Sequence, residues 1–314
     1  MANVTIVCPC YNEEAALPIY YEAMCGRVFE KLPQHAFTLL LVNDGSCDGT
    51  LKEMKALAKR DTRVEYISFS RNFGKEAALY AGLTHARGEY VAVMDCDLQD
   101  PPEMIPEMLA RVESGECDCV ATRRVTRKGE PAIRSAFARA FYRLINRISD
   151  TEFVDGARDF RVMRRNMVDA VCALPEYHRF SKGLFMWVGF DTEWLEYENV
   201  ERAAGETKWS FWKLFSYAIE GIVSFSTVPL RIATIVGCVV SAAALIYMVI
   251  RVVIALFIGK PVAGYPSLLA IMLGLGGLTL LALGIIGEYV ARTYEQSKGR
   301  PIYVMKESNI GEQE

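Results

Sequence analysis

Two long apolar segments near the end of the chain set the first limit on its fold. Residues 232–258 carry one charged side chain, Arg251, and residues 267–286 carry none. At about 1.5 Å per helical residue, either segment can cross the roughly 30 Å hydrocarbon core of a bilayer. One such segment could also be a buried core helix, but two joined by a short loop containing Gly and Pro predict a pair of transmembrane helices.

Positive charges near these segments predict their orientation. Basic residues concentrate on the cytosolic side of a membrane. The loop between the segments carries only Lys260, and the outer flanks carry Lys213, Arg231, Arg292, Lys298, Arg300 and Lys306. We therefore expect a two-span protein of the inner or cell membrane, with both termini in the cytosol.

The segment before the first span is unusually aromatic. Residues 209–225 contain six Trp, Phe or Tyr side chains and few charges. This composition is typical of an interfacial helix lying along a membrane, with a buried core helix as the alternative. We expect four parts, namely a cytosolic domain over 1–208, an interfacial region over 209–230, a two-helix membrane domain over 231–292 and a cytosolic tail over 293–314.

Composition and the N-terminus limit the function classes. A net charge of −3 makes a general nucleic-acid partner an unexpected one. No charged leader with an apolar segment precedes the first strand-like run, so we expect a cytosolic domain in which the nine cysteines need no pairing. The pairs Cys8–Cys10 and Cys117–Cys119 lack His partners at zinc-finger spacing, which favours buried thiols over structural zinc.

The first 125 residues alternate between strand-like and helix-like runs. Short apolar runs predict strands at 4–8, 39–43, 64–68, 90–94 and 119–121, and helical periodicity covers 48–59, 75–86 and 102–114. This alternation predicts an α/β fold, with a Rossmann-like, mostly parallel sheet and helices on both faces. Ligands of such sheets bind beyond the carboxyl ends of the strands.

The fourth predicted strand ends in two carboxylates, Asp95 and Asp97. Because side chains alternate along a strand, we expect both on the same face. Two like charges at this spacing are unfavourable without a nearby cation. Oxygen ligands suit Mg²⁺ or Mn²⁺, which commonly lies between a protein carboxylate and a substrate phosphate. A solvated Asp-rich turn before a helix is the alternative.

Two other strand ends carry candidate binding residues. The first strand runs into Tyr11 and Glu13. Tyr11 could stack on a flat base, although these residues also make an ordinary helix start. The second strand ends in Asp44, which could accept a hydrogen bond from a base, with adjacent glycines that let the backbone approach a ligand. An Asx turn is the alternative for Asp44.

Residues 126–165 and the positions just before them are basic. The cluster consists of Arg123, Arg124, Arg127, Lys128, Arg134, Arg139, Arg143 and Arg147. These side chains could form a solvated helix face. They could equally form a surface for phosphates of a nucleotide, a lipid carrier or anionic lipids.

In this order and spacing, the motifs resemble the family 2 glycosyltransferases. The matching residues are Pro9…Asn12-Glu13, Asp44-Gly45-Ser46, and Asp95-x-Asp97-x-Gln99 followed by Pro101-Pro102-Glu103. Within that family, the chain from residue 4 to about residue 303 looks like the polyprenyl-phosphate glycosyltransferases, which include bactoprenol glucosyltransferases and dolichol-phosphate mannose synthases. Further matches lie at residues 70–75, 159–163, 205–209 and 229–231. Asn43 and Thr207 depart from the usual Asp and Ser of this pattern.

The resemblance implies a nucleotide-sugar-binding domain of GT-A type and a role for each matching residue. Nucleotide-sugar binding would fall to Pro9, Tyr11, Glu13, Asp44, Lys75 and Asp95. Binding of Mg²⁺ or Mn²⁺ would fall to Asp97 and Gln99. Catalytic positions would be Asp95, Asp97, Asp159 and Arg161, and the acceptor phosphate or donor diphosphate would contact Arg123, Arg127 and Lys208.

The implied reaction is inverting transfer of one sugar from a nucleotide sugar to a polyprenyl phosphate in the membrane. UDP-glucose is the favoured donor, whereas mannose, galactose, N-acetylhexosamine and 4-amino-arabinose donors remain open. A homotetramer or smaller homo-oligomer is also implied. A non-catalytic membrane adaptor that retains the fold is the alternative of another class. A processive polysaccharide synthase is disfavoured, because none of the four Trp residues stands in a Gln-x-x-Arg-Trp motif.

Overall fold

A computed structural model describes most of the chain, namely residues 2–125, 142–149, 151–198, 219–258 and 264–311. The chain divides into two compact units, which are described one at a time. The first comprises Met1–Ser224 and Pro301–Glu314, and the second comprises Phe225–Arg300.

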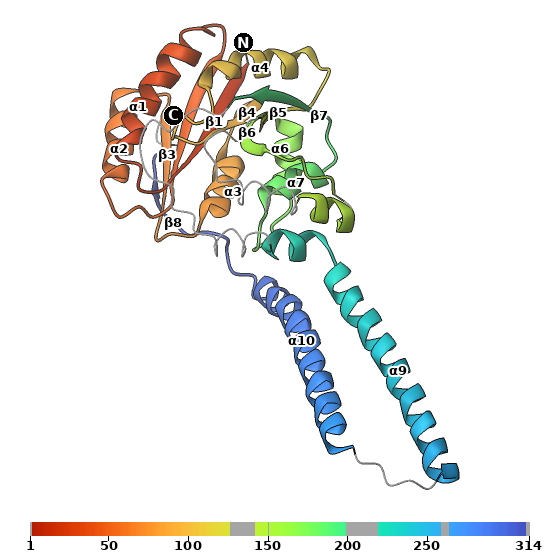
Figure 1. The fold of residues 1–314 in the computed structure, drawn as a ribbon. Coiled ribbons are helices and arrows are strands. Elements are labelled where there is room, and N and C mark those ends of the chain that lie inside the picture. The colour runs from red at the N-terminus through yellow and green to blue at the C-terminus, as the bar shows by residue number, and fades with distance from the viewer. Residues whose placement is uncertain (1, 126–141, 150, 199–218, 259–263, 312–314) are drawn as a thin grey trace. The chain divides into compact units, whose positions relative to one another are not determined.

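The first unit is built on an eight-stranded sheet with the order β7-β5-β6-β4-β1-β2-β3-β8 (Figure 1). The strands are β1 (Asn3–Cys10), β2 (Ala36–Asn43), β3 (Val64–Phe69), β4 (Tyr90–Val93), β5 (Cys119–Arg124), β6 (Ala157–Arg164), β7 (Thr192–Tyr197) and β8 (Met305–Ser308). Neighbours are parallel except where β6 pairs with β4 and β5 and where β8 pairs with β3. The predicted mostly parallel sheet is confirmed.

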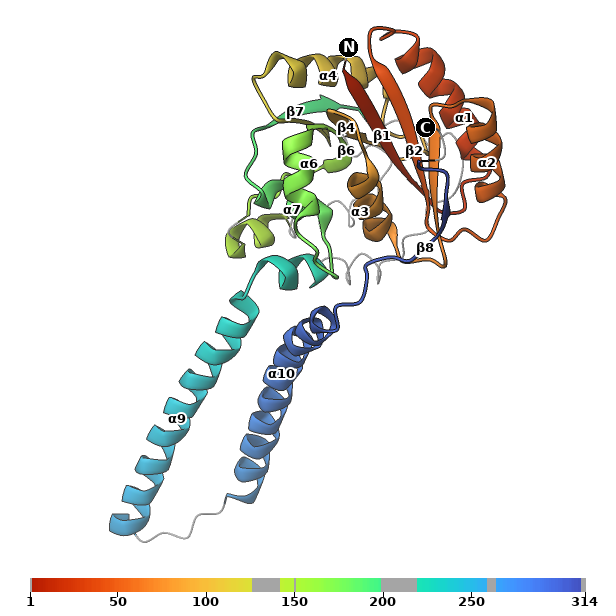
Figure 2. The same cartoon turned by 180° about the vertical axis from the view of Figure 1, so that it is seen from behind.

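Helices cover both faces of this sheet (Figures 1 and 2). One face packs against α1 (Ala16–Met24), a π-helical turn (Cys25–Phe29), α2 (Thr50–Arg60) and α4 (Ile105–Ser114), which follows a 3-10 turn (Pro102–Met104). The other face packs against α3 (Lys75–His85), α6 (Arg165–Cys172) and α7 (Ser181–Trp187). Because β1 alternates, Ile6 and Cys8 face the first group while Val7 faces the second.

The turn after β4 differs from the prediction. The strand ends at Val93, so Asp95 and Asp97 lie in a turn and strand alternation does not place them on one face. Within this turn Leu98 has a φ of 53°, in the left-handed region that non-glycine residues rarely adopt. The chain therefore leaves the sheet earlier than the apolar run suggests. The backbone of the turn, and not strand alternation, determines the directions of the two carboxylates.

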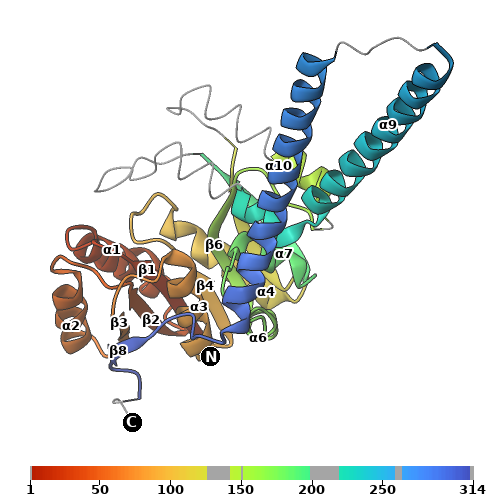
Figure 3. The ribbon, with the colours of Figure 1, turned by 90° about the horizontal axis from the view of Figure 1, so that it is seen from below.

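Part of the expected C-terminal tail instead joins the sheet. Strand β8 pairs antiparallel with β3, as Figure 3 shows. The Tyr303 ring stacks on Phe69 with centroids 4.9 Å apart, and Asn309 Oδ1 accepts a 2.6 Å hydrogen bond from Tyr66 N. These contacts hold β8 against β3 and cover the edge of β3. The short, charged sequence of β8 did not predict a strand.

The second unit contains two long helices, α9 (Val228–Ile258) and α10 (Tyr265–Ser297). Their apolar stretches, Val228–Ile250 and Ile271–Ser297, are long enough to cross a membrane, and neither is buried within the structure. The length and composition of these helices indicate membrane anchoring. Of the predicted interfacial segment, residues 219–225 are helical, and 209–218 lie outside the described residues.

Candidate active site

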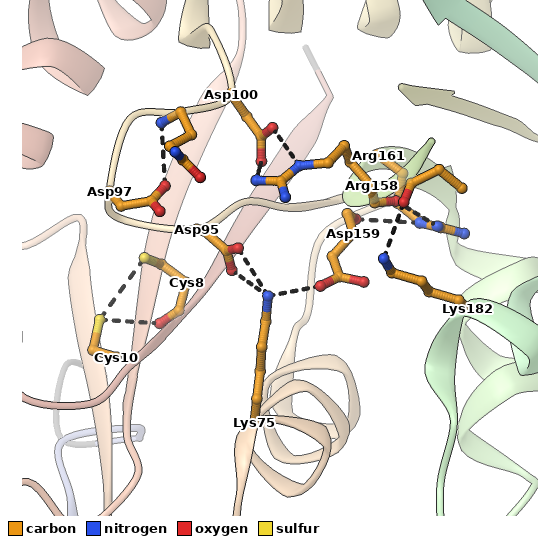
Figure 4. Close-up of polar contacts among 12 residues, drawn as sticks. Cys8, Cys10, Lys75, Asp95, Asp97, Asp100, Arg158, Asp159, Arg161 and Lys182 are labelled. Carbon is orange, nitrogen blue, oxygen red and sulfur yellow. Dashed lines mark hydrogen bonds and ion pairs between the residues drawn. The ribbon is translucent and has the colours of Figure 1, made fainter. Parts of the chain in front are cut away.

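Side chains from three elements meet at the carboxyl edge of the sheet (Figure 4). Lys75 is the first residue of α3, Asp95 follows β4, and Asp159 lies near the start of β6. Since β6 runs antiparallel to β4, its first residues lie beside those that follow β4. The Lys75 Nζ atom is 2.8 Å from the Asp95 carboxylate and 2.6 Å from Asp159 Oδ2, so one ammonium group bridges two carboxylates.

The charges of this cluster keep Asp159 and Lys75 ionised. Burial opposes ionisation of Asp159, but the charges of Lys75 and Lys182 outweigh burial and hold the pKa of Asp159 well below its ordinary value. Burial likewise opposes the charge of Lys75, but Asp159 and Asp95 outweigh it and raise the pKa of Lys75. With 43% of its side chain exposed, Lys75 also faces solvent. A substrate could therefore reach it.

The turn that carries Asp97 is held by its own hydrogen bonds. Gln99 N donates to Asp97 Oδ1 over 3.1 Å, and Arg124 of β5 donates to Gln99 Oε1 over 3.2 Å. Leu98, whose φ is positive, lies between Asp97 and Gln99 in the sequence. Strained residues of this kind gather at functional sites, where the surrounding structure maintains them.

A second charged cluster supports the same turn. Asp100, 1% exposed, accepts hydrogen bonds from Arg158 Nε at 3.0 Å and from the Tyr197 hydroxyl. Asp100 raises the pKa of Arg158 against its burial, so this guanidinium stays charged. The end of the turn is thereby fixed to β6 and β7.

Arg161, predicted as catalytic, lies behind the reacting edge. Its guanidinium donates to the backbone oxygens of Asp159 at 3.2 Å and of Arg158 at 3.0 Å. Its Cζ atom lies 3.8 Å from the centroid of the Phe185 ring, and the residue is 1% exposed. In this structure Arg161 supports the backbone that carries Asp159.

Asp44 joins the second strand end to the loop before α3. Its carboxylate accepts hydrogen bonds from Phe73 N at 2.7 Å and from Gly74 N. Burial raises the pKa of Asp44 to about 6, although both hydrogen bonds act in the opposite direction. A Cβ atom at Gly45, whose φ is +62°, would lie 2.2 Å from the Arg71 carbonyl carbon, so the two loops are in close contact.

The first strand end lies against the same loops. Asn12 N donates to Ser46 Oγ at 3.0 Å, and Glu13 N donates to Thr50 Oγ1 at 2.8 Å. Pro9 is buried in β1, whereas the Tyr11 side chain is exposed. The structure thus brings the predicted residues of the first two strand ends together.

The predicted phosphate-contacting residues are only partly described. Arg123 lies in β5 and forms an ion pair with Glu196 of β7. Arg127 and Lys208 lie outside the described residues. The described part of the basic stretch, residues 142–149 and 151–165, contributes Arg143 and Arg147 to an open groove of about 490 Å³.

Several residues of the site were not predicted. Arg158 and Asp100 form the supporting ion pair, and Lys182 donates to Ala157 O over 3.0 Å. Glu76 accepts hydrogen bonds from the backbone and hydroxyl of Ser181, which joins α3 to α7. Glu76, Asp100 and Arg158 adjoin motifs that the sequence did single out, whereas no motif marked Lys182.

The donor atoms of the Asp97 turn fit a hard divalent cation. Asp97 and Gln99 offer carboxylate and amide oxygens two residues apart, and Asp95 adds a nearby carboxylate. Mg²⁺ typically uses one or two carboxylates and completes its coordination with water and substrate phosphates. Asp97 and Gln99 form the candidate pair, because the Lys75 ammonium ion-pairs with Asp95; a cation at this pair would share Gln99 Oε1 with Arg124.

Known proteins share this sequence pattern. The model of the protein family described as "Glycosyl transferase family 2" matches residues 5–172 of the chain. The chain belongs to this family. A prophage bactoprenol glucosyl transferase homologue from Escherichia coli strain K12 is 43% identical over 304 residues, which cover 97% of this chain and 98% of the relative. The prophage-derived bactoprenol glucosyl transferase of Shigella flexneri is 42% identical over 98% of this chain and 99% of its own.

The chain is also similar, more distantly, to solved structures. The glucosyl-3-phosphoglycerate synthase of Mycobacterium tuberculosis, in complex with Mn²⁺, UDP-glucose and phosphoglyceric acid, is 19% identical and has a TM-score of 0.46. The match covers 71% of this chain and 78% of that protein.

Proposed function

We propose that this glycosyltransferase moves glucose from UDP-glucose to a polyprenyl phosphate, giving a lipid-linked sugar. One observation carries the proposal, namely the nearly full-length likeness to bactoprenol glucosyl transferases, which includes both apolar helices. The charged edge formed by Lys75, Asp95 and Asp159 supplies chemistry suited to it.

The donor would lie across the first two strand ends. Pro9, Tyr11, Glu13 and Asp44 would hold the base and ribose, with Tyr11 exposed for stacking. To bind the base directly, the Asp44 carboxylate would release its hydrogen bond from Phe73 N and accept one from the base instead. Alternatively, Asp44 would hold the loop before α3 in place, and that loop would contact the base. Lys75 and Asp95 would lie next to the sugar and diphosphate.

Negative charge develops on the diphosphate as the sugar bond breaks. Asp97 and Gln99 would hold Mg²⁺ or Mn²⁺, which stabilises such charge when bound. Basic side chains of the chain act in the same direction. Lys75 adjoins the site, and Arg123, Arg127 and Lys208 are candidates for contact with the diphosphate or the acceptor phosphate.

The acceptor needs little help in losing its proton. Its phosphate has a second pKa of about 6 and is largely ionised at pH 7. Asp159, whose pKa lies well below its ordinary value, is a weak proton acceptor. We therefore assign Asp159 to orienting the sugar hydroxyls and Lys75. Direct displacement by the phosphate oxygen would invert the anomeric centre.

The membrane segments fit a lipid acceptor. Helices α9 and α10 would keep the chain at the bilayer, where a polyprenyl phosphate presents its head group. Both termini and the first unit would lie on the cytosolic side, as the positive-inside rule predicts. A homo-oligomer of four chains or fewer remains part of the proposal.

A donor panel on full-length, detergent-solubilised protein tests the proposal. UDP-glucose, UDP-galactose, UDP-N-acetylglucosamine and GDP-mannose are each offered with undecaprenyl phosphate and Mg²⁺ or Mn²⁺, with and without EDTA. We expect a glucosyl phospholipid, read by mass, from UDP-glucose alone and only without EDTA. Product from another donor would correct the sugar.

Two negative outcomes have separate meanings. Donor hydrolysis without glycolipid would contradict the proposed acceptor while retaining the donor. Absence of both turnover and donor binding would overturn the enzymatic proposal in favour of a membrane adaptor.

A further inference from the structure

Three cysteine thiols converge in the core beside the candidate site. Cys8 and Cys10 point to the same face of β1, and Cys96 lies in the turn between Asp95 and Asp97. Their exposed fractions are 0%, 2% and 3%. The three Sγ atoms all lie within 4.8 Å of one another, and those of Cys8 and Cys10 are 3.8 Å apart. Figure 4 shows this pair beside Asp95.

This spacing is close to that of thiolates sharing one metal ion. Zinc binds thiolate sulfur at about 2.3 Å, so two thiolates on a tetrahedral zinc lie about 3.8 Å apart. Cys8 and Cys10 already have this separation. The other sulfur pairs would need to close by at most about 1 Å, which side-chain rotation can supply.

A buried hydroxyl completes the surroundings. Tyr20 of α1 is 0% exposed, and its hydroxyl lies next to the Cys8 thiol without making a hydrogen bond of standard geometry to any residue that the structure describes. It can donate a hydrogen bond to a thiolate or lie near the fourth position of a metal.

We propose that Cys8, Cys10 and Cys96 bind one thiophilic cation of the Zn²⁺ class, at a site separate from the oxygen donors of Asp97 and Gln99. Soft thiolate ligands select such ions over Mg²⁺ and Mn²⁺. The expectation of buried thiols without metal rested on the local spacing of the two C-x-C pairs and on their lack of His partners. The third ligand comes from 86 residues further along the chain and is invisible to local spacing.

The site would tie the turn after β4 to β1. Cys96 separates Asp95 from Asp97, so a cation on its sulfur would fix the backbone between the two carboxylates. This inference does not depend on the proposed function, because the thiols and their spacing would bind a cation whichever reaction the site performs.

Metal binding to the full-length protein in detergent, reduced with a phosphine, tests the proposal. Protein stripped of metal and titrated with Co²⁺ should develop thiolate charge-transfer absorption that saturates at one ion per chain and is displaced by Zn²⁺. Excess Mg²⁺ should not displace it. Cys10→Ala and Cys96→Ala should each weaken Co²⁺ binding by more than about 100-fold.

The second C-x-C pair of the chain provides the matched control. Cys117 and Cys119 are also buried, but no third thiol joins them among the described residues. The double variant Cys117→Ala/Cys119→Ala should bind Co²⁺ like the parent protein.

Folding is checked independently by the thermal unfolding of every variant. Zn²⁺ should raise the melting temperature of the parent and of the control variant only. The proposal is wrong if the parent protein binds Co²⁺ no better than Cys96→Ala. It is also wrong if the control variant loses as much Co²⁺ binding as Cys96→Ala does. Failure of the parent protein to bind Co²⁺ after its thiols have been fully reduced would overturn the proposal as well.

Discussion

The Nζ atom of Lys75 lies 2.6 Å from Oδ2 of Asp159, although 84 positions separate the two residues in the sequence. The same Nζ atom contacts Asp95, so α3, β6 and the turn after β4 share one cation. Without the shared ammonium group, the neighbouring carboxylates of Asp95 and Asp159 would repel each other, which favours protonation of one of them. Lys75 therefore holds the two carboxylates in place and balances their charge at this edge of the sheet.

Removing this cation should disable the site while leaving the fold. Lys75→Met removes the ammonium that pairs with Asp95 and Asp159 and that, in the proposed function, lies next to the donor diphosphate. We expect glucosyl transfer to fall by about 100-fold or more, a loss typical of a group that stabilises developing charge. Steady-state rates with the proposed substrates provide the measurement.

The matched control is Lys55→Met. Lys55 pairs with Glu307 at 2.7 Å and is about as exposed as Lys75, but it lies on α2 against β8. This variant should retain nearly full activity. Equal losses in the two variants would mean that Lys75 acts only through stability.

The oxygen donors of the turn should be needed for turnover. Asp97→Ala removes a proposed ligand of the divalent cation, and we expect activity to be abolished while the protein remains folded and membrane-bound. EDTA should have the same effect on the parent protein, and added Mg²⁺ or Mn²⁺ should reverse it. Asp169→Ala on α6, whose side chain is 67% exposed, provides a control with normal activity. Turnover by Asp97→Ala would remove this residue from the metal role.

The sequence predicted the parts of the fold that depend on local pattern. Apolar runs marked β1 to β5, and the two long apolar segments marked α9 and α10. It did not predict β6, β7 or β8, because their sequences mix charged and apolar residues. Glu307 and Lys306, for example, lie in a strand that forms only because β3 offers it an edge.

The site was predicted to a similar degree. Motifs identified Lys75, Asp95 and Asp159, which the structure brings together. Local spacing could not show that Lys182 would adjoin Asp159, or that Arg161 would support the backbone instead of facing the edge. Contacts between residues far apart in the sequence depend on the antiparallel register of β6 with β4, which no motif encodes.

Asp44 should make stability depend on pH in a defined direction. Its pKa is raised from 3.8 to about 6, so the folded state binds a proton more tightly than the unfolded state. Its contribution to stability is complete below about pH 4 and is lost as the pH rises through about 6. The full effect is at most about 3 kcal/mol.

The variant Asp44→Asn isolates this effect, because its amide cannot ionise and can still accept from Phe73 N. The free energy of unfolding of the parent protein, relative to that of the variant, should fall between pH 4 and pH 7. A constant difference across this range would show that Asp44 does not titrate there.

Arg161 should act on the reaction by positioning Asp159. Arg161→Met leaves two backbone oxygens without their donor, at a cost of about 1–3 kcal/mol each in the free energy of unfolding. We expect kcat to fall more than KM rises, since the variant leaves the proposed donor site at the ends of β1 and β2 unchanged. Arg161→Lys should recover part of kcat. Equal changes in kcat and in the Kd for UDP would instead indicate general unfolding of the site.

Asn309 should stabilise the first unit by anchoring the chain just after β8. Its side chain accepts from Tyr66 N at 2.6 Å and donates to Val64 O at 3.2 Å, which satisfies two backbone groups of the β3 edge. Asn309→Ala should therefore lower the free energy of unfolding by about 1–3 kcal/mol. Lys55→Met removes the exposed ion pair between α2 and Glu307 of β8. It should lower the free energy of unfolding by less than about 1 kcal/mol. Denaturant titration of both variants measures the difference, and equal losses would mean that β8 is held by its surface charges instead of by the hydrogen bonds of Asn309.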